Sequence, residues 1–325
     1  MKKIYSFALM LCAAALITAG LTSCEGDGFD EHSVGNLENG NVSDLPYGYR
    51  VRTVGDISYS YKRNGKLNFI RIGNEKFDMS GKTLEIENEN ETSKYTFKFN
   101  SFNYVEKINY RFTGKDESCS STAKFSYLNR QLYRIEVESD QQFKEDGQDI
   151  AATYDATYEF SYESQCLRRL RIKINESQKT GNKNSQAKQT YSYSFKYENT
   201  PDFYNRYYQW TPNVVIACFD EQDEILEALA YVGMLGRASR QLPYAIVGEG
   251  SGKLLNGDAV DYGHTFDCEY NFNSYDAIRI ADGVSYTYTE RDDDYEVKPY
   301  VHIDTRAAKP ATESRSFFGH NTIRK

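Results

Sequence analysis

The fold is decided by residues 158–174, which read YEFSYESQCLRRLRIKI. In the first part of this stretch, Tyr158, Phe160 and Tyr162 alternate with polar side chains, and in its last part leucine and isoleucine alternate with arginine and lysine. Alternation with a period of two gives a strand one apolar and one polar face. Such strands are typical of antiparallel sheets that are packed on one side. The stretch therefore predicts a hairpin with a short polar turn around Ser164.

The same arrangement recurs along the chain. In each copy an aromatic residue closes one strand, a short polar turn follows, and two apolar residues three apart open the next strand. The copies are Tyr61 with Leu67 and Ile70, Phe99 with Val105 and Ile108, Tyr127 with Leu132 and Ile135, Tyr162 with Leu167 and Leu170, and, less regularly, Phe272 with Ala277 and Ile280. A single hairpin cannot bury its apolar face, so repeated hairpins must stack on one another. The sequence predicts a mainly β fold, a large antiparallel meander of hairpins that forms a curved or barrel-like sheet.

One segment departs from this pattern. Residues 220–236 begin with acidic side chains, continue with an apolar stripe and end at Gly236. Acidic residues suit the positive N-terminal end of a helix, and glycine commonly follows its last turn. The segment predicts one short helix, inserted in the meander and packed on its aromatic face or in an open end. The stripe consists of Ile225, Leu226, Leu229, Val232 and Leu235.

The N-terminus has the layout of a secretion signal. A basic start, Lys2-Lys3, precedes an apolar run over residues 7–17 that is too short to span a membrane. The run is followed by Leu21-Thr22-Ser23-Cys24, the pattern of a bacterial lipobox. We expect residues 1–23 to be a signal peptide and Cys24 to carry a lipid, since each buried methylene of an acyl chain contributes about 0.8 kcal/mol to membrane binding. The alternative is a simple signal peptide with a chance cysteine.

Composition divides the remaining chain. Residues 24–46 are rich in glycine, asparagine and acidic side chains and poor in apolar ones, so they are expected to be a flexible tether. Strand-like alternation begins after residue 56. We expect residues 47–305 to form a single antiparallel β domain and residues 306–325 to be a flexible C-terminal tail.

The overall composition excludes several classes of protein. The 325-residue chain has 39 basic and 47 acidic side chains, for a net charge of −8, and contains 28 tyrosines and 18 phenylalanines. So many aromatic residues argue against a disordered chain. The acidic balance argues against nucleic acid as a partner, because phosphate binding requires clustered lysines and arginines.

No motif for catalysis, metal binding or cofactor binding stands out. The four histidines, His32, His264, His302 and His320, have no metal-ligand spacing, and the chain has neither a nucleophile elbow nor a phosphate-binding loop. A glycosidase needs two facing carboxylates, but 47 acidic residues are too many for a pair to be identified. We therefore predict no catalytic residue, no metal site and no cofactor.

Four cysteines lie outside the signal and the lipobox. An exported protein meets an oxidising environment, in which Cys119, Cys166, Cys218 and Cys268 allow three pairings. Cys218 and Cys268 have apolar surroundings, which favour free buried thiols, whereas Cys119 and Cys166 lie in turn-like sequence. The sequence does not decide which of these four cysteines, if any, form disulfides with one another.

The most suggestive candidate for ligand binding is an aromatic segment in the long insertion of the meander. Aromatic rings can form a flat platform for a sugar, and arginine can bind its hydroxyl groups. The alternative, which we favour in a chain so rich in tyrosine, is that the rings cover the sheet edge and join it to the helix. The candidate residues are Tyr204, Arg206, Tyr207, Tyr208 and Trp210.

The lipobox, the Tyr-x-Tyr hairpins with a following Leu-x-x-Ile, and the segment Gly233-Met-Leu-Gly236-Arg-Ala-Ser239-Arg-Gln-Leu242-Pro243 together carry a family resemblance. Over roughly residues 55–290 the chain resembles uncharacterised Bacteroidetes lipoproteins that have a domain of unknown function with a porin-like β fold. The resemblance implies an envelope location and supplies no activity and no catalytic residue. The acidic start of the tether, residues 25–31, is also similar to the surface-export signal of Bacteroidetes lipoproteins; the alternative is an ordinary linker.

These observations favour a lipid-anchored protein of the outer membrane, exposed on the cell surface if the acidic export signal operates. Its expected role is non-catalytic binding or support, with a glycan or an envelope protein as partner and no nucleic acid. The second hypothesis is a surface lipoprotein that binds or processes polysaccharides. Strands that span the membrane themselves would alternate in the same way, but they gather their aromatic residues in two girdles, whereas here the aromatics run along whole strands.

Overall fold

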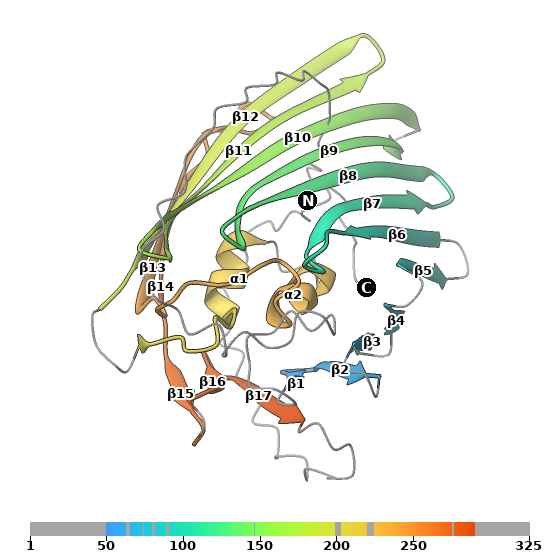
Figure 1. Ribbon diagram of the computed structural model, residues 1–325. Coiled ribbons are helices and arrows are strands. Elements are labelled where there is room, and N and C mark those ends of the chain that lie inside the picture. Colours follow the sequence, from blue (N-terminus) through green and yellow to red (C-terminus); the bar gives the residue numbers. More distant parts are fainter. Residues whose placement is uncertain are drawn as a thin grey trace.

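The computed structural model describes residues 50–289, apart from residues 63–65, 74, 80–81, 89–90, 146, 199–202, 220–223 and 275. Its strands form two antiparallel sheets, and two short helices lie between these sheets (Figure 1). The predicted mainly β meander is therefore confirmed. The predicted signal peptide, Cys24, the predicted tether and the predicted C-terminal tail lie outside the described residues.

The larger sheet is a continuous meander of ten strands in chain order, β5 to β14. Every strand pairs with the next one along the chain, and the longest strands extend well beyond the helices (Figure 1). The strands are β5 (Thr83–Asn88), β6 (Glu91–Phe99), β7 (Val105–Thr113), β8 (Glu117–Leu128), β9 (Gln131–Glu145), β10 (Gln148–Glu163), β11 (Cys166–Thr180), β12 (Lys183–Lys196), β13 (Ala245–Lys253) and β14 (Tyr262–Asp267).

The smaller sheet contains seven strands in the order β15-β16-β17-β1-β2-β3-β4, so the last strand pairs with the first. Thr53 of β1 and Thr287 of β17 share a hydrogen bond of 2.7 Å between their hydroxyl groups. Among the described residues no ladder joins β4 to β5 or β14 to β15, and the two sheets do not close into a barrel. The strands are β1 (Arg50–Val54), β2 (Ile57–Tyr61), β3 (Leu67–Ile72), β4 (Glu75–Asp78), β15 (Tyr270–Phe272), β16 (Ile278–Ala281) and β17 (Val284–Thr289).

The register of the hairpins confirms the predicted repeat. In each of the first four copies the aromatic residue pairs with the first apolar residue of the next strand, and the register shifts immediately before the aromatic. A shift of this kind bends the strand and increases its twist, which contributes to the curvature of the large sheet in Figure 1. In the fifth copy Phe272 pairs with Ile278 and not with the expected Ala277. The four regular pairs are Tyr61 and Leu67, Phe99 and Val105, Tyr127 and Leu132, and Tyr162 and Leu167.

The two faces of the large sheet differ in polarity. Along β10, Tyr154, Tyr158 and Phe160 are buried, with relative exposures of 3–5%. On the opposite face of the same strand, Glu159 forms an ion pair with Lys173 of β11, with 3.0 Å between Oε2 and Nζ. The inner face of β10 is therefore apolar and its outer face is charged, as the alternating sequence predicts.

The described residues form two helices, whereas the sequence predicted one. Helix α2 (Glu224–Tyr231) lies inside the predicted range but ends earlier, because Gly233 has a φ of +72° and terminates it. The N–H groups of Gly233 and Met234 bond back to the carbonyls of Ala230 and Leu229, which is the usual glycine-dependent helix ending.

Helix α1 (Pro212–Cys218) was missed. Its sequence is almost uniformly apolar, so it has no polar stripe from which a helical period could be recognised. Proline at its first turn is the remaining local signal, since proline fits the start of a helix but not its interior. No helix among the described residues combines the length and the apolarity required for crossing a membrane.

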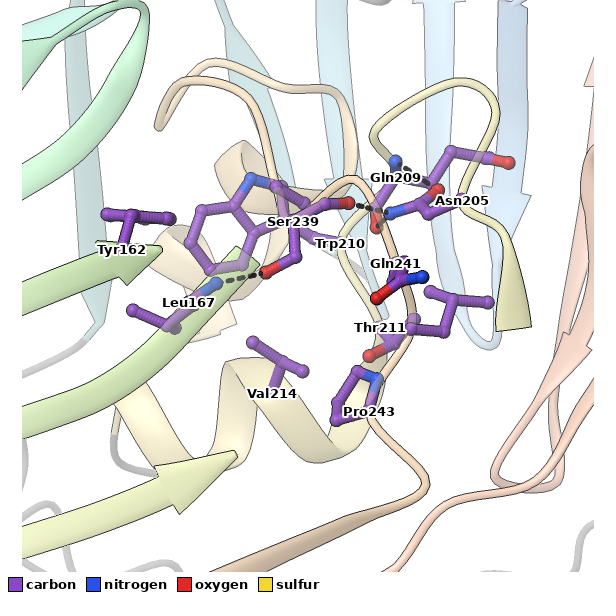
Figure 2. A pocket seen from close by; sticks show the side chains of 12 residues that line it. Tyr162, Leu167, Asn205, Gln209, Trp210, Thr211, Val214, Ser239, Gln241 and Pro243 are labelled. Carbon is purple, nitrogen blue, oxygen red and sulfur yellow. Dashed lines mark hydrogen bonds between the residues drawn. The ribbon is translucent and has the colours of Figure 1, made fainter. Parts of the chain in front are cut away.

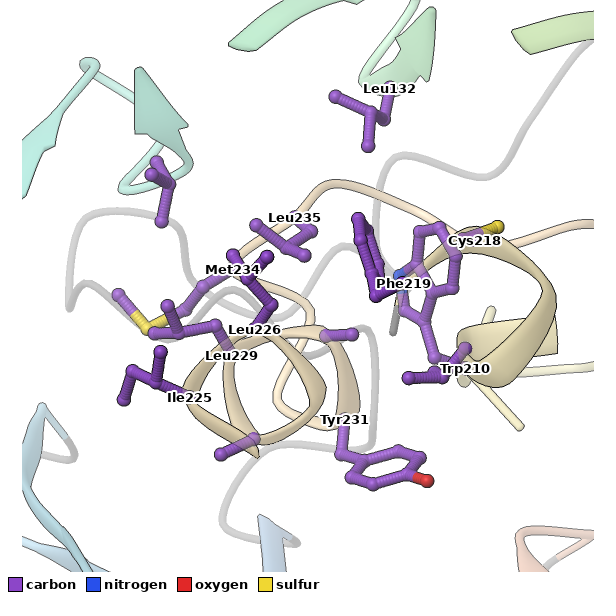
Figure 3. Close-up of a cluster of buried hydrophobic side chains, with 14 of the residues drawn as sticks. Leu132, Trp210, Cys218, Phe219, Ile225, Leu226, Leu229, Tyr231, Met234 and Leu235 are labelled. Carbon is purple, nitrogen blue, oxygen red and sulfur yellow. The ribbon is translucent and has the colours of Figure 1, made fainter. Parts of the chain in front are cut away.

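The core lies between the helices and the sheets (Figure 3). Leu226 and Leu229 of α2 have no exposed surface, and Tyr59 of β2 donates its hydroxyl hydrogen to the carbonyl of Ala228 at 2.9 Å. From the large sheet, the N–H of Val105 bonds to the carbonyl of Met234 at 2.9 Å. The helices thus fill the space that the curved strands enclose, and they tie both sheets together.

Candidate binding surface at the insertion

The long connection between β12 and β13 brings the predicted aromatic segment against the core. Trp210 is 1% exposed, and its indole Nε1 donates to the carbonyl of Gly236 at 2.9 Å. Its own carbonyl accepts a hydrogen bond from the hydroxyl of Tyr286 at 2.9 Å. The indole belongs to the interior and is not available at the surface (Figure 2).

Two buried amide side chains fix the path of this segment. Asn205 donates from Nδ2 to the carbonyls of Gln209 and Ser239, both at 2.9 Å, and its Oδ1 accepts from the N–H of Gln209. Gln209 donates to the hydroxyl of Tyr288 at 2.8 Å and accepts from the N–H of Ile278 at 3.0 Å. Buried polar groups are costly unless they are paired, so these bonds hold residues 205–209 in one conformation.

The space around this network is nearly filled. The cavity between Trp210, Asn205 and Ser239 has a volume of about 10 Å³, which is at the lower limit for one water molecule (Figure 2). A larger depression of about 600 Å³ lies at the ends of β10 to β12, and Glu163 is the one carboxylate among the residues that line it. Neither space brings two carboxylates together.

The other four predicted residues lie toward solvent. Tyr204 is 41% exposed, and Arg206 pairs with Asp276 of the β15–β16 turn at 2.7 Å. The hydrogen bond from Arg206 to Asp276 raises the pKa of this arginine above its ordinary value. Tyr207 and Tyr208 are half-buried. The structure therefore separates Trp210 from the tyrosines and the arginine with which the sequence grouped it.

Further arginines, which the sequence analysis missed, pair with these rings. The guanidinium of Arg237 lies 5.0 Å from the ring centre of Tyr208, and that of Arg240 lies 5.9 Å from the ring centre of Tyr204. At the β8–β9 turn, Arg130 lies 5.5 Å from the ring centre of Phe102. We call these six residues the arginine–aromatic strip: Phe102, Arg130, Arg237, Tyr208, Arg240 and Tyr204.

Main-chain hydrogen bonds join the parts of the strip. The N–H of Arg237 donates to the carbonyl of Arg130 at 2.8 Å, and the N–H of Arg240 donates to the carbonyl of Gln165 at 3.0 Å. The hydroxyl of Tyr208 donates to the side-chain oxygen of Gln165 at 3.1 Å. The insertion is therefore fastened to the turns of two successive hairpins, β8–β9 and β10–β11.

A glycine permits the close approach. Gly236 has a φ of +84°, and a Cβ placed on it would lie 2.7 Å from the carbonyl oxygen of Arg130 and 3.1 Å from the ring of Tyr127. Only a residue without a side chain fits this conformation and this distance. The sequence signal for the contact was present in the segment 233–243, but the hairpin turn that it meets lies about a hundred residues earlier in the chain.

All four cysteines of the β domain are free and buried. Cys119 lies inside β8 rather than in the turn that its sequence suggested, and Cys166 begins β11. Burial raises the pKa of Cys119 to about 11 and that of Cys268 to about 12. Thiols with a raised pKa are poor nucleophiles. Within the described part of the chain, no group of three His, Cys, Asp or Glu side chains could hold a metal ion.

The carboxyl group of Asp282 has a clearly shifted pKa. Burial raises the pKa of Asp282 from 3.8 to about 6, and the backbone N–H of Glu269, which donates to Asp282 at 2.8 Å, offsets part of this shift. Asp282 follows β16 and lies close to Cys268.

Comparison with known proteins finds a likeness among solved structures. The chain matches no family model and no curated protein sequence. Among solved structures it is similar to a porin-like protein from Bacteroides uniformis ATCC 8492, with 15% sequence identity and a TM-score of 0.39. The alignment covers 75% of this chain and 96% of that one.

Proposed function

We propose that the protein is a lipoprotein of the bacterial cell envelope, anchored through Cys24, and that its β domain is a non-catalytic binding module. The lipobox supports the anchor, and the acidic residues 25–31 support export to the cell surface of the outer membrane. The observation that carries the binding role is the arginine–aromatic strip, because exposed rings and guanidinium groups are held there on a rigid scaffold.

The polarity of the sheets supports an anchored domain over one whose strands face lipid. A lipid-facing strand surface is apolar, and a charge at the middle of the bilayer costs about 2–4 kcal/mol. On the outer face of β10 and β11 the side chains include Glu159, Arg171 and Lys173. The enclosed space, in turn, is filled by α1, α2 and their apolar contacts.

Replacement of the lipid-bearing cysteine tests the anchor. Cys24→Ser should prevent acylation, so that the protein no longer takes up a fatty-acid label and moves to the fraction that a carbonate wash releases. Cys12→Ser, in the apolar run of the signal, is the matched control and should remain labelled and membrane-bound. Membrane association of the Cys24→Ser protein after the wash would contradict the proposal.

A further inference from the structure

We infer that the arginine–aromatic strip binds an anionic polysaccharide, a chain of sugars in which carboxylate or sulfate groups recur. The inference rests on the proposed role as a binding module, and it adds the class of ligand and the residues that contact it. Four features of the strip carry the inference: its charge, the geometry of its guanidinium groups, its spacing and its backbone conformation.

The strip is a positive region on a negatively charged chain. Within the residues that the structure describes, Arg130 and Arg240 form no ion pair, whereas the flanking Arg168 and Arg206 are paired with Glu163 and Asp276. The chain as a whole has a net charge of −8. Unpaired arginines on such a chain favour an anionic ligand locally, while the rest of the surface disfavours unspecific binding of polyanions.

The rings hold the guanidinium groups in place. Arg130, Arg237 and Arg240 each lie over an aromatic ring at 5.0–5.9 Å from its centre. The stacked guanidinium groups of Arg130 and Arg240 keep an N–H edge available, and this edge matches the two oxygens of a carboxylate. Because the side chains are already ordered, less conformational entropy is lost when a ligand binds.

The spacing suits a polymer with regularly placed charges. Phe102, Arg130 and Gln165 belong to the turns of three successive hairpins, β6–β7, β8–β9 and β10–β11. Neighbouring hairpins are two strand spacings apart, or about 10 Å. The strip therefore follows the ends of the strands over a length suited to several linked sugars, and the exposed rings of Phe102 and Tyr204, 42% and 41% exposed, offer flat surfaces for sugar rings.

The backbone of the strip is strained. Arg130 and Tyr208 of the strip have φ values of +63° and +51°, and Gln165, to which the hydroxyl of Tyr208 donates, has a φ of +63°. Glycine adopts this conformation without a steric penalty, but long side chains do not. Asn129-Arg130 and Ser164-Gln165 occupy tight hairpin turns at which Asn-Gly is the favoured pair. Strained positions of this kind concentrate at functional sites.

Binding of three polymers tests the ligand class. The purified full-length protein in detergent is titrated with polygalacturonate, with neutral dextran and with polyglutamate, which carries carboxylates but no sugar rings. Polygalacturonate should bind, and its affinity should fall as salt is added because the charges are exposed. Its affinity should exceed that of the other two polymers by at least about tenfold, which is the effect of one charged hydrogen bond.

Two pairs of variants with the same change of charge test the location. Arg130→Gly with Arg240→Gln should weaken polygalacturonate binding by at least about tenfold, while the melting temperature stays equal or rises because the strain at residue 130 is relieved. The control pair, Arg111→Gln with Arg171→Gln on β7 and β11, removes two exposed arginines elsewhere and should bind as the unchanged protein does.

Tyr204→Ala should also weaken binding, whereas Tyr133→Ala, which removes an equally exposed ring from β9, should not. If the two double arginine variants lost polygalacturonate affinity equally, the assignment of the binding site to the strip would be overturned. The same holds if the two tyrosine variants lost affinity equally.

Several results would overturn the ligand class. If polyglutamate bound as tightly as polygalacturonate, the ligand would be any acidic polymer. If dextran bound as tightly, charge would not be required. Preferential binding to vesicles with anionic lipids would identify a membrane surface as the ligand. No binding of any polysaccharide would reject the inference and leave the anchor untouched. The anchor fails only if the Cys24→Ser protein stays on the membrane.

Discussion

At the scale of single residues, Trp210 illustrates how a surface candidate becomes a core residue. Loops that contain aromatic, arginine and amide side chains resemble ligand sites in sequence, and nothing local tells which ring points inward. Trp210 is buried because its indole N–H finds the carbonyl of Gly236, whereas Tyr204, six residues earlier, remains exposed. Long-range partners decide this difference, and the sequence does not contain their positions.

Removal of this indole should destabilise the domain. Trp210→Ala would leave a cavity in a site that is 1% exposed and would also leave the carbonyl of Gly236 without its donor. Truncation of a buried large aromatic residue costs about 3–5 kcal/mol, so the variant should melt many degrees lower. Since Trp210 is the sole tryptophan, the emission of the unchanged protein should be blue-shifted and resistant to iodide quenching. Emission typical of exposed indole would contradict its burial.

The buried carboxyl group of Asp282 should make stability depend on pH. Its pKa is raised from 3.8 to about 6 in the folded chain, so the folded state binds the proton more tightly than the unfolded state does. The contribution of Asp282 is therefore fully present below pH 3.8 and is lost as the pH rises through 6. Asp282→Asn, which cannot ionise, should melt higher than the unchanged protein at pH 8, and this advantage should vanish below pH 4. A constant difference across this range would contradict the assignment.

At the scale of elements, the strands were predictable and the helices only partly so. Strands such as β10 and β11 can be recognised from the alternation of apolar and polar residues, and their turns can be recognised from polar residues. Both signals are local in the sequence. Helix α2 has a recognisable apolar stripe, but its end depends on Gly233 rather than on Gly236. Helix α1 is almost uniformly apolar, since most of its residues lie in the core, and such a run shows no clear helical period.

Helix α2 should owe its stability to its surroundings. Eight residues are too few for an independent helix in water, and Leu226, Ala228 and Leu229 have no exposed surface. We expect the amide hydrogens of Leu229 and Ala230 to exchange only when the whole domain unfolds, which native-state hydrogen exchange can measure. Exchange at lower free energy than in β10 and β11 would show that the helix opens separately.

At the scale of the whole molecule, the sequence predicted one curved or barrel-like sheet, whereas the described strands form two sheets. The breaks fall between β4 and β5 and between β14 and β15, where short strands meet the long meander. The prediction that strands pair with their neighbours along the chain was correct, because the meander follows chain order. Where pairing stops depends on the curvature of the sheet and on the helices that fill it, and neither is encoded in a local pattern. The arginine–aromatic strip was hidden for the same reason, because its members come from separate hairpins and from the insertion.

The pairing of β1 with β17 bears on how the protein is made. The two strands are contributed by residues 50–54 and 284–289, so this contact waits until nearly the whole β domain has been synthesised. The hairpins of the large sheet involve neighbours in sequence and can form one after another, because closing a short loop costs little entropy. Folding should therefore proceed from the meander outward, and the first strand to emerge should be among the last to find its partner.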